Sequence, residues 1–337
     1  MQISKKQKRE IEKEDIKRII IKNYSGLLSN FYEMQSGFLS ARYKIHNSLE
    51  TANIIIGFIK DVHLGILRQR EKSLDYNISL DAFLQNLKEV NLPTQKIVTV
   101  VKSTGIPKET VRRKINKLLE KDFIYKNEKN EYYWNLSSKR KELFMKVMEN
   151  DIIMISKFVH NVTKYFDLNF SEKSIADEIK SQFSFYFYHF LSSQLGWFKM
   201  WQNKIKDIDL VLITLQALIP TLQKAEKTEL IKNVGIENFH TVVGRNFNQQ
   251  KVVAITVSAT SISDVTGIPR ATCMRKLTKL QKLGLLVQEK KTKRYFVNQI
   301  TTDRTKNILT KDNISETVEI FSQYLTIIIN SMIYNRK

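Results

Sequence analysis

Hydrophobic residues recur at helical spacing along most of this chain of 337 residues. Apolar positions repeat every three to four residues over four long segments, which we expect to be amphipathic helices: about 13–46, 49–72, 172–204 and 207–227. A further long helix is expected at 138–166 and another at 302–334. Proline, which interrupts helices, occurs only four times. The pattern therefore predicts a mainly α-helical protein.

One phrase of the sequence occurs twice. TGIPKETVRRKI begins at Thr104 and returns as TGIPRATCMRKL at Thr266, 162 positions later. An ungapped comparison of residues 103–134 with 265–296 has eleven identities in 32 positions, and it pairs Tyr133 with Tyr295. Weaker similarity at a slightly different offset extends upstream, where NIIIGFI (53–59) resembles DLVLITL (209–215). We therefore expect an internal duplication with two parts, 1–168 and 169–337.

Each copy of the phrase contains the signals of two helices joined by a short turn. In the second copy we expect Thr256 to cap a first helix. Gly267 should end that helix, because glycine readily adopts the left-handed conformation at a helix C-terminus. Pro269 is typical of the start of the next helix, where no backbone N–H is needed. The first copy has the same signals, with Thr94 as the cap and Gly105 at the turn.

The helix after each turn should be amphipathic. We expect it at 108–121 in the first copy and at 270–283 in the second. Its apolar side chains recur at i, i+4 and i+7, so they should face the core. They are Val111, Ile115 and Leu118 in the first copy and Cys273, Leu277 and Leu280 in the second. The period then changes to about two, which predicts a β-hairpin with a basic tip at 123–135 and at 285–297.

This order of helix, turn, helix and basic hairpin resembles the winged helix-turn-helix of bacterial transcription regulators, the MarR- and GntR-like groups among them. The resemblance rests on T-G-I-P-[KR]-x-T-x-x-[RK]-[KR]-[IL] and on the Y-W or Y-F strand, and it covers about 94–135 and 256–298. In such proteins the second helix enters the major groove and the hairpin, called the wing, touches the DNA backbone or the minor groove. Many relatives gain their second unit by homodimerising, whereas this chain carries two.

The resemblance implies a set of DNA contacts. From the second helices they are Lys108, Glu109, Thr110, Arg112, Arg113 and Asn116 in the first copy, and Arg270, Thr272, Met274, Arg275 and Thr278 in the second. From the hairpins they are Lys126, Lys129, Lys290, Lys291, Lys293 and Arg294. Arginine pairs with guanine, and threonine meets a thymine methyl or a phosphate. Basic hairpin residues mainly neutralise phosphates. Because Arg112 aligns with Met274, the two copies should not read the same bases.

The composition changes this picture in two ways. A formal net charge of +21 attracts polyanions, and nucleic acid is the first candidate. The single cysteine, Cys273, allows no disulfide framework and no cysteine metal site within one chain, which fits a reducing cytosol. Cys273 aligns with Val111, so we expect a core residue. The N-terminus lacks a signal-peptide pattern, and no apolar run approaches the roughly 20 residues of a membrane span. We expect a cytoplasmic, nucleoid-associated protein without a membrane partner.

The sequence contains no pattern that supports an enzyme. It has no nucleophile elbow, P-loop, dinucleotide fingerprint or zinc motif, and its five histidines are scattered. We expect no catalytic residues, no cofactor and no bound metal. The aromatic run FSFYFYHF (183–190), with Trp197 and Trp201, is compatible with an effector pocket. Helix packing between the two parts explains it more simply.

The expected function is sequence-specific binding of double-stranded DNA in transcriptional control. The long helices should pack the two parts across an internal pseudo-twofold axis, so that one chain acts as a pseudo-dimer; a homodimer stays open. Two alternatives also stay open. A plasmid-type replication initiator also uses paired winged helices in one chain. In an architectural or partner-binding protein, the winged helices would be scaffolds. The sequence identifies no effector.

Overall fold

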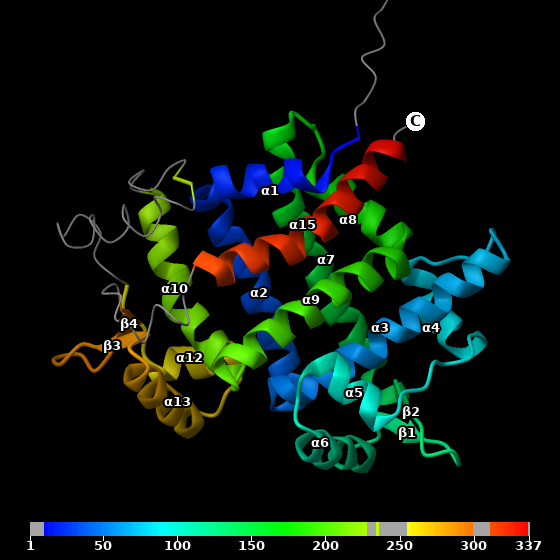
Figure 1. Ribbon diagram of the computed structural model, residues 1–337, viewed down its shortest axis with the longest axis horizontal. Coiled ribbons are helices and arrows are strands. Elements are labelled where there is room, and N and C mark those ends of the chain that lie inside the picture. Colours follow the sequence, from blue (N-terminus) through cyan, green and yellow to red (C-terminus); the bar gives the residue numbers. More distant parts are fainter. Residues whose placement is uncertain (1–9, 228–233, 236–254, 299–310, 336–337) are drawn as a thin grey trace, which may run out of the picture.

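A computed structural model describes residues 10–227, 234–235, 255–298 and 311–335. Thirteen α-helices, two short 3-10 segments and two antiparallel two-stranded hairpins lie within these residues (Figure 1). The mainly α-helical class predicted from the hydrophobic pattern is confirmed.

The first part of the chain has eleven elements. In order they are α1 (Lys13–Lys22), α2 (Tyr24–His46), α3 (Leu49–Lys72), α4 (Leu80–Glu89), α5 (Ile97–Thr104), α6 (Lys108–Glu120), β1 (Ile124–Lys126), β2 (Tyr132–Trp134), η1 (Ser138–Arg140), α7 (Lys141–Thr163) and η2 (Lys164–Phe166). The helix expected at 49–72 is confirmed as α3. A single helix over 13–46 is wrong, because the chain leaves helical geometry at Asn23 (φ −110°, ψ 31°). The sequence did not predict α4, whose first turn is capped by Ser79.

The second part repeats much of this order. Its elements are α8 (Glu172–Ser181), α9 (Phe183–Ile205), α10 (Asp209–Lys227), α12 (Ala259–Thr266), α13 (Arg270–Lys282), β3 (Leu286–Gln288), β4 (Tyr295–Val297) and α15 (Lys311–Tyr334). A single helix over 172–204 is wrong, since the chain breaks at Gln182 (φ −113°, ψ 39°). Residues 302–310 of the last expected helix lie outside the described residues, and the remainder forms α15.

The breaks and ends of the long helices occur at matching places. Gln182 follows Asn23 by 159 positions, and the two residues have nearly the same backbone angles. Helix α2 ends before Asn47 (φ 55°) and α9 ends before Lys206 (φ 57°), which are again 159 positions apart and both left-handed. The long helices of the two parts therefore start and end with the same backbone conformations.

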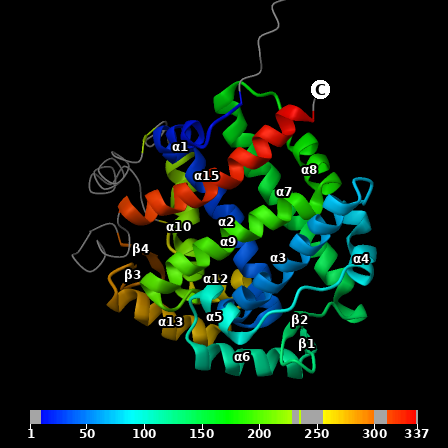
Figure 2. The same ribbon diagram turned by 45° about the vertical axis from the view of Figure 1, so that its right-hand side comes forward.

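Helices from the two parts pack on each other in reciprocal pairs. Helix α3 contacts α9, and α2 contacts α10. At the far side α1 contacts α15, and α7 contacts α8. Figures 1 and 2 show α2 and α9 in the centre, with α10 to the left of them, α3 to the right, α1 and α15 above, and α6 and α13 along the lower edge. The two parts therefore share one core.

The aromatic run of α9 lies in this shared core. Phe183, Phe187 and Phe190 are at most 1% exposed. The ring of Phe183 lies 5.3 Å from that of Phe83 on α4, and the ring of Phe190 lies 5.4 Å from that of Phe38 on α2. Full burial of such a ring contributes about 1.5–3 kcal/mol. Packing between the two parts, the simpler of the two readings of this run, is confirmed.

The first and last described helices also lie together. The backbone N–H of Ile11 donates to the side chain of Asn330, and the Asn330 amide donates back to the carbonyl of Ile11 at 2.8 Å. Lys13 pairs with Glu319, and Ile16 on α1 is fully buried. Helix α1 therefore packs on α15 and not on its sequence neighbours alone.

Candidate nucleic-acid interface

Two helix–hairpin units carry the repeated phrase. The first unit consists of α5, α6, β1 and β2, and the second of α12, α13, β3 and β4. Gly105 (φ 71°) and Gly267 (φ 76°) end the first helix of each unit in the left-handed region, as predicted. Pro107 and Pro269 then occupy the position directly before α6 and α13. The turn between the two helices is therefore the same in both units.

The threonine at the start of the phrase stabilises this turn with two hydrogen bonds. The Thr104 hydroxyl donates to the carbonyl of Val100 at 2.7 Å and accepts from the N–H of Ile106 at 3.3 Å. Thr266 makes the matching bonds, to Ile262 at 2.6 Å and from Ile268 at 3.2 Å. Both threonines are fully buried. Their identity in the two copies therefore has a structural reason, since one hydroxyl satisfies backbone groups on both sides of the turn.

The predicted caps at Thr94 and Thr256 are wrong. Helix α5 starts at Ile97 and has no side-chain cap, and α12 starts at Ala259 behind a Ser258 cap. The residues just after the two threonines are extended, because Gln95 pairs with Tyr132 and Val257 with Tyr295 in antiparallel bridges. A short strand-like segment thus precedes each unit's first helix and adds a third strand position to the hairpin.

The second helix of each unit agrees with its prediction. Helices α6 and α13 end within one residue of the expected bounds. The apolar side chains expected to face the core are at most 2% exposed: Val111, Ile115, Leu118, Cys273, Leu277 and Leu280. Cys273 is a core residue as expected, and burial raises the pKa of its thiol to about 11. One face of each helix therefore packs against the core, and the opposite face is exposed to solvent.

The hairpins correct the sequence comparison by one residue. Strand β1 pairs with β2 and β3 with β4, both antiparallel, as predicted. Tyr132 and Tyr295 hold the equivalent bridge positions, so Tyr295 is the counterpart of Tyr132 and not of Tyr133. The second hairpin loop is thus one residue longer. After it, Asn135 donates to the carbonyl of Asp122 at 2.7 Å, and Asn298 donates to that of Gly284 at 2.8 Å.

The elements that carry the predicted contact residues lie along one edge of the molecule. All seventeen are exposed except Thr110 and Thr272, which are half-buried. Figures 1 and 2 show α6 and α13 along the same edge, with the β1–β2 hairpin beyond one helix and the β3–β4 hairpin beyond the other. A rod-shaped polyanion laid along this edge would meet a hairpin, two helices and a second hairpin in turn.

The two hairpins differ in charge. Residues 289–294 contain four basic side chains and one acidic side chain, and all six residues are exposed. Residues 126–131 contain two basic and two acidic side chains. Hydrogen bonds from Asn127 and Thr94 lower the pKa of Glu131, which keeps that carboxylate charged. The second hairpin therefore attracts phosphate more strongly than the first.

Lys114 and Lys276 are residues of the two units to which the sequence pattern assigned no role. They are identical in the two copies but lie between the buried and the exposed helix faces. The Lys114 ammonium lies 3.1 Å from Glu50, and the Lys276 ammonium lies 2.7 Å from Asp207 and 3.1 Å from Asp209. Both lysines point back toward the central helices, so they do not belong to the exposed contact surface.

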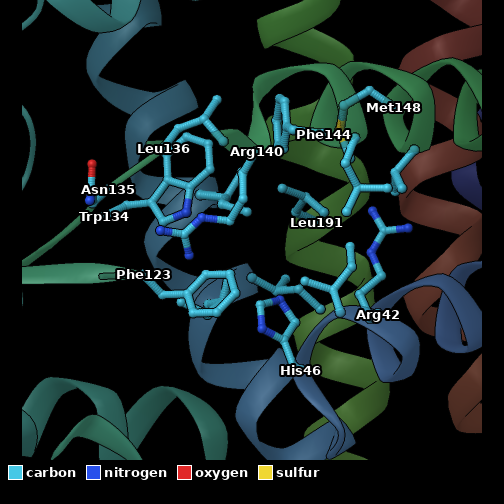
Figure 3. Close-up of a pocket in the computed structure, with 16 residues that line it drawn as sticks. Arg42, His46, Phe123, Trp134, Asn135, Leu136, Arg140, Phe144, Met148 and Leu191 are labelled. Atoms are coloured by element: carbon cyan, nitrogen blue, oxygen red, sulfur yellow. The ribbon is translucent and has the colours of Figure 1, made fainter. Parts of the chain in front are cut away.

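A small apolar cavity lies behind the first hairpin (Figure 3). Phe123 and His46 lie on one side of it and Arg140 and Phe144 on the other. Its volume of ≈ 60 Å³ is less than half of the roughly 150 Å³ that admits benzene. In this conformation it has room for water-sized molecules and not for an organic effector.

Arg140 beside this cavity holds the end of α6. Its guanidinium lies 4.0 Å above the centre of the Phe123 ring and donates to the carbonyls of Lys121 and Asp122 at 3.2 and 2.6 Å. Burial, with Arg42 and Arg140 nearby, lowers the pKa of His46 to about 3, so that imidazole is neutral. The cavity wall thus ties the start of α7 to the end of α6.

The described residues were also compared with the requirements of a metal site and of a membrane span. No group of three or more His, Cys, Asp or Glu there is arranged to hold a metal ion. None of the helices described is both long and apolar enough to cross a membrane. Comparisons of the chain with protein-family models, curated proteins and solved structures found no match.

Proposed function

We propose that the protein binds double-stranded DNA sequence-specifically and regulates transcription as a single-chain pseudo-dimer. Each helix–hairpin unit acts as a winged helix-turn-helix, with α6 and α13 as the recognition helices and the two hairpins as wings. The observation that carries the proposal is the placement of two such units, with exposed basic residues, on one side of a core that both parts of the chain share.

The proposal includes an internal duplication with parts at 1–168 and 169–337. Matching helix breaks at Asn23 and Gln182 support it, as do matching turn bonds from Thr104 and Thr266. The reciprocal contacts of α2 with α10 and of α3 with α9 are those that a twofold axis would generate. If both recognition helices enter the major groove on one face of a duplex, their half-sites are centred about 10–10.5 base pairs apart.

The exposed side chains of the two recognition helices are matched at some positions and differ at others. Arg113 and Arg275 occupy matched exposed positions on the recognition helices. In this proposal both pair with base edges. Arg112 pairs with Glu109 at 3.0 Å, whereas the matching position in α13 is Met274. The two half-sites therefore differ in sequence, and the operator is an imperfect repeat.

The test is selection of binding sequences from a random DNA pool, with Arg113→Ala and Arg275→Ala as variants. We expect a two-part motif, with each variant losing information in one part only. The number of copies of the selected motif at each natural target separates the two regulatory readings, because many tandem copies at one target would instead favour a replication initiator. Binding that depends on salt but enriches no motif, and that neither variant changes, would refute the proposal and leave an architectural role.

A further inference from the structure

Lys114 and Lys276 occupy matched positions on α6 and α13, and both contact the start of a central helix. Lys114 donates to Ser48, which caps α3, at 2.9 Å and pairs with Glu50 in the first turn of α3. Lys276 bonds both carboxylate oxygens of Asp207, at 2.7 and 3.0 Å. The same anchor, from the middle of a recognition helix to the start of a central helix, is thus built twice.

The acidic partners of the two lysines also bridge the two parts of the chain. Asp209 at the start of α10 accepts from the backbone N–H of Leu49, the first residue of α3, at 3.2 Å. Glu50 on α3 accepts from the Gln202 amide of α9 at 3.5 Å. Each lysine therefore contacts a carboxylate that also binds a helix from the other part. A chain of polar contacts runs from α6 through Lys114, Glu50 and Gln202 into α9, and another from α13 through Lys276 and Asp209 into α3.

These anchors are shielded from solvent. The side chains of Lys114 and Lys276 are 13% and 17% exposed, and that of Asp209 is 17% exposed. Burial works to lower the pKa of Lys276, but Asp209 and Asp207 outweigh it, so the pKa is raised and the lysine stays charged. Partly buried pairs of this kind are screened by salt far less than surface pairs.

The turn glycines provide a second link between each unit and the other part. A Cβ added at Gly267 would lie 2.6 Å from Cγ of Lys44 on α2, and one added at Gly105 would lie 3.5 Å from Cγ of Lys199 on α9. At its turn, the first unit therefore contacts α9 and the second unit contacts α2, so each touches a helix of the opposite part. The lysine of each unit contacts the start of a helix of its own part, α3 for Lys114 and α10 for Lys276. Two separate attachments fix both the position and the tilt of a recognition helix.

We infer that Lys114 and Lys276 are positioning residues that set the separation of the two recognition helices, and thereby the half-site spacing that the protein accepts. This inference rests on the proposed DNA-binding function. Each added base pair moves a half-site by about 3.4 Å and turns it by about 35°. A protein whose recognition helices are held this firmly should discriminate sharply between spacings, and one with a loosened helix should not.

The first experiment measures binding to operators in which the selected half-sites are moved apart or together by one and two base pairs. We expect the wild type to lose about tenfold in affinity for each base pair, and Lys114→Met and Lys276→Met to lose about threefold or less. Lys117→Met is the matched control, because Lys117 lies on α6 but is exposed. It should weaken binding to all spacings by the same factor.

Exchanging the charges of Lys114 and Glu50 distinguishes a positioning role from a general loss of folding. Lys114→Glu should relax the spacing preference, and adding Glu50→Lys should restore it, since the pair is then re-formed with reversed charges. Restoration in the double variant supports a positioning role. A double variant that keeps the wild-type melting temperature but stays relaxed in spacing contradicts it.

A second measurement needs no DNA. Spin labels at Asn116→Cys and Thr278→Cys, two matched exposed positions on α6 and α13, report the distance between the recognition helices. The native Cys273 is fully buried and should not be labelled. A distance distribution that broadens in Lys276→Met supports the inference even if no two-part motif is selected, in which case only the proposed function fails. Unchanged distances together with an unchanged spacing preference overturn the inference and leave the proposed function standing.

Discussion

The four basic residues of the second hairpin offer the sharpest test of the proposed contact with DNA. We consider a variant in which Lys290, Lys291, Lys293 and Arg294 are all glutamine. These side chains are exposed, so their replacement should leave the core intact. Each phosphate contact contributes about 0.9 to the slope of log affinity against log salt. If all four residues bind phosphate, the slope should become shallower by about 3.6.

That change in slope is large enough to measure directly. Between 50 and 200 mM salt, the wild type should lose about 100-fold more affinity than the variant. Fluorescence anisotropy with a labelled operator at five or six salt concentrations gives both slopes. The matched control replaces Lys126 and Lys129 of the first hairpin, where Glu128 and Glu131 balance the charge. Its slope should change by less than about 1.8. If the second-hairpin variant changes the slope by less than about one, this hairpin does not lie on the DNA backbone.

Three further predictions concern folding and the buried thiol. Gly267→Ala should destabilise the protein by about 1–3 kcal/mol in urea unfolding, because φ is +76° and the new Cβ would clash with Lys44; Gly105→Ala should cost less. Burial lowers the pKa of His63 to about 3, whereas its unfolded value is near 6.5. The contribution of neutral His63 to the free energy of unfolding is therefore complete above about pH 6.5 and is lost as the pH falls toward 3, at up to about 1.4 kcal/mol per pH unit. His63→Leu should make the free energy of unfolding, measured in urea, depend less on pH over this range. Cys273 should resist a thiol reagent at pH 7 in the native protein and react fully in urea; rapid native reaction would contradict its burial.

Local signals in the sequence were sufficient for the helix–hairpin units. Gly105 and Gly267 predicted the two helix ends, because few residues other than glycine readily adopt the left-handed conformation there. The i, i+4, i+7 spacing of α6 and α13 identified their buried faces. The caps failed for a reason that local signals do not contain. Whether Thr94 starts a helix depends on whether Gln95 pairs with Tyr132, which lies far along the chain.

The breaks and the packing of the long helices could not be predicted from the pattern of each segment alone. Asn23 and Gln182 interrupt helices without proline or glycine, so hydrophobic periodicity ran through both breaks. The ungapped comparison also missed the extra residue in the second hairpin loop, because Tyr132 and Tyr133 are both tyrosine. The roles of Lys114 and Lys276 required their partners at the starts of α3 and α10, and only the packed structure brings these together.

The contact between α1 and α15 has a consequence for how the chain folds as it is made. Ile11 and Asn330, which bond each other, are 319 positions apart, so a ribosome adding about 5–20 residues per second needs about 15–60 s to make one after the other. During that interval the buried face of α1, with Ile16 and Ile20, has no α15 to pack on. The nascent chain should therefore present an apolar helix to chaperones until α15 has left the exit tunnel.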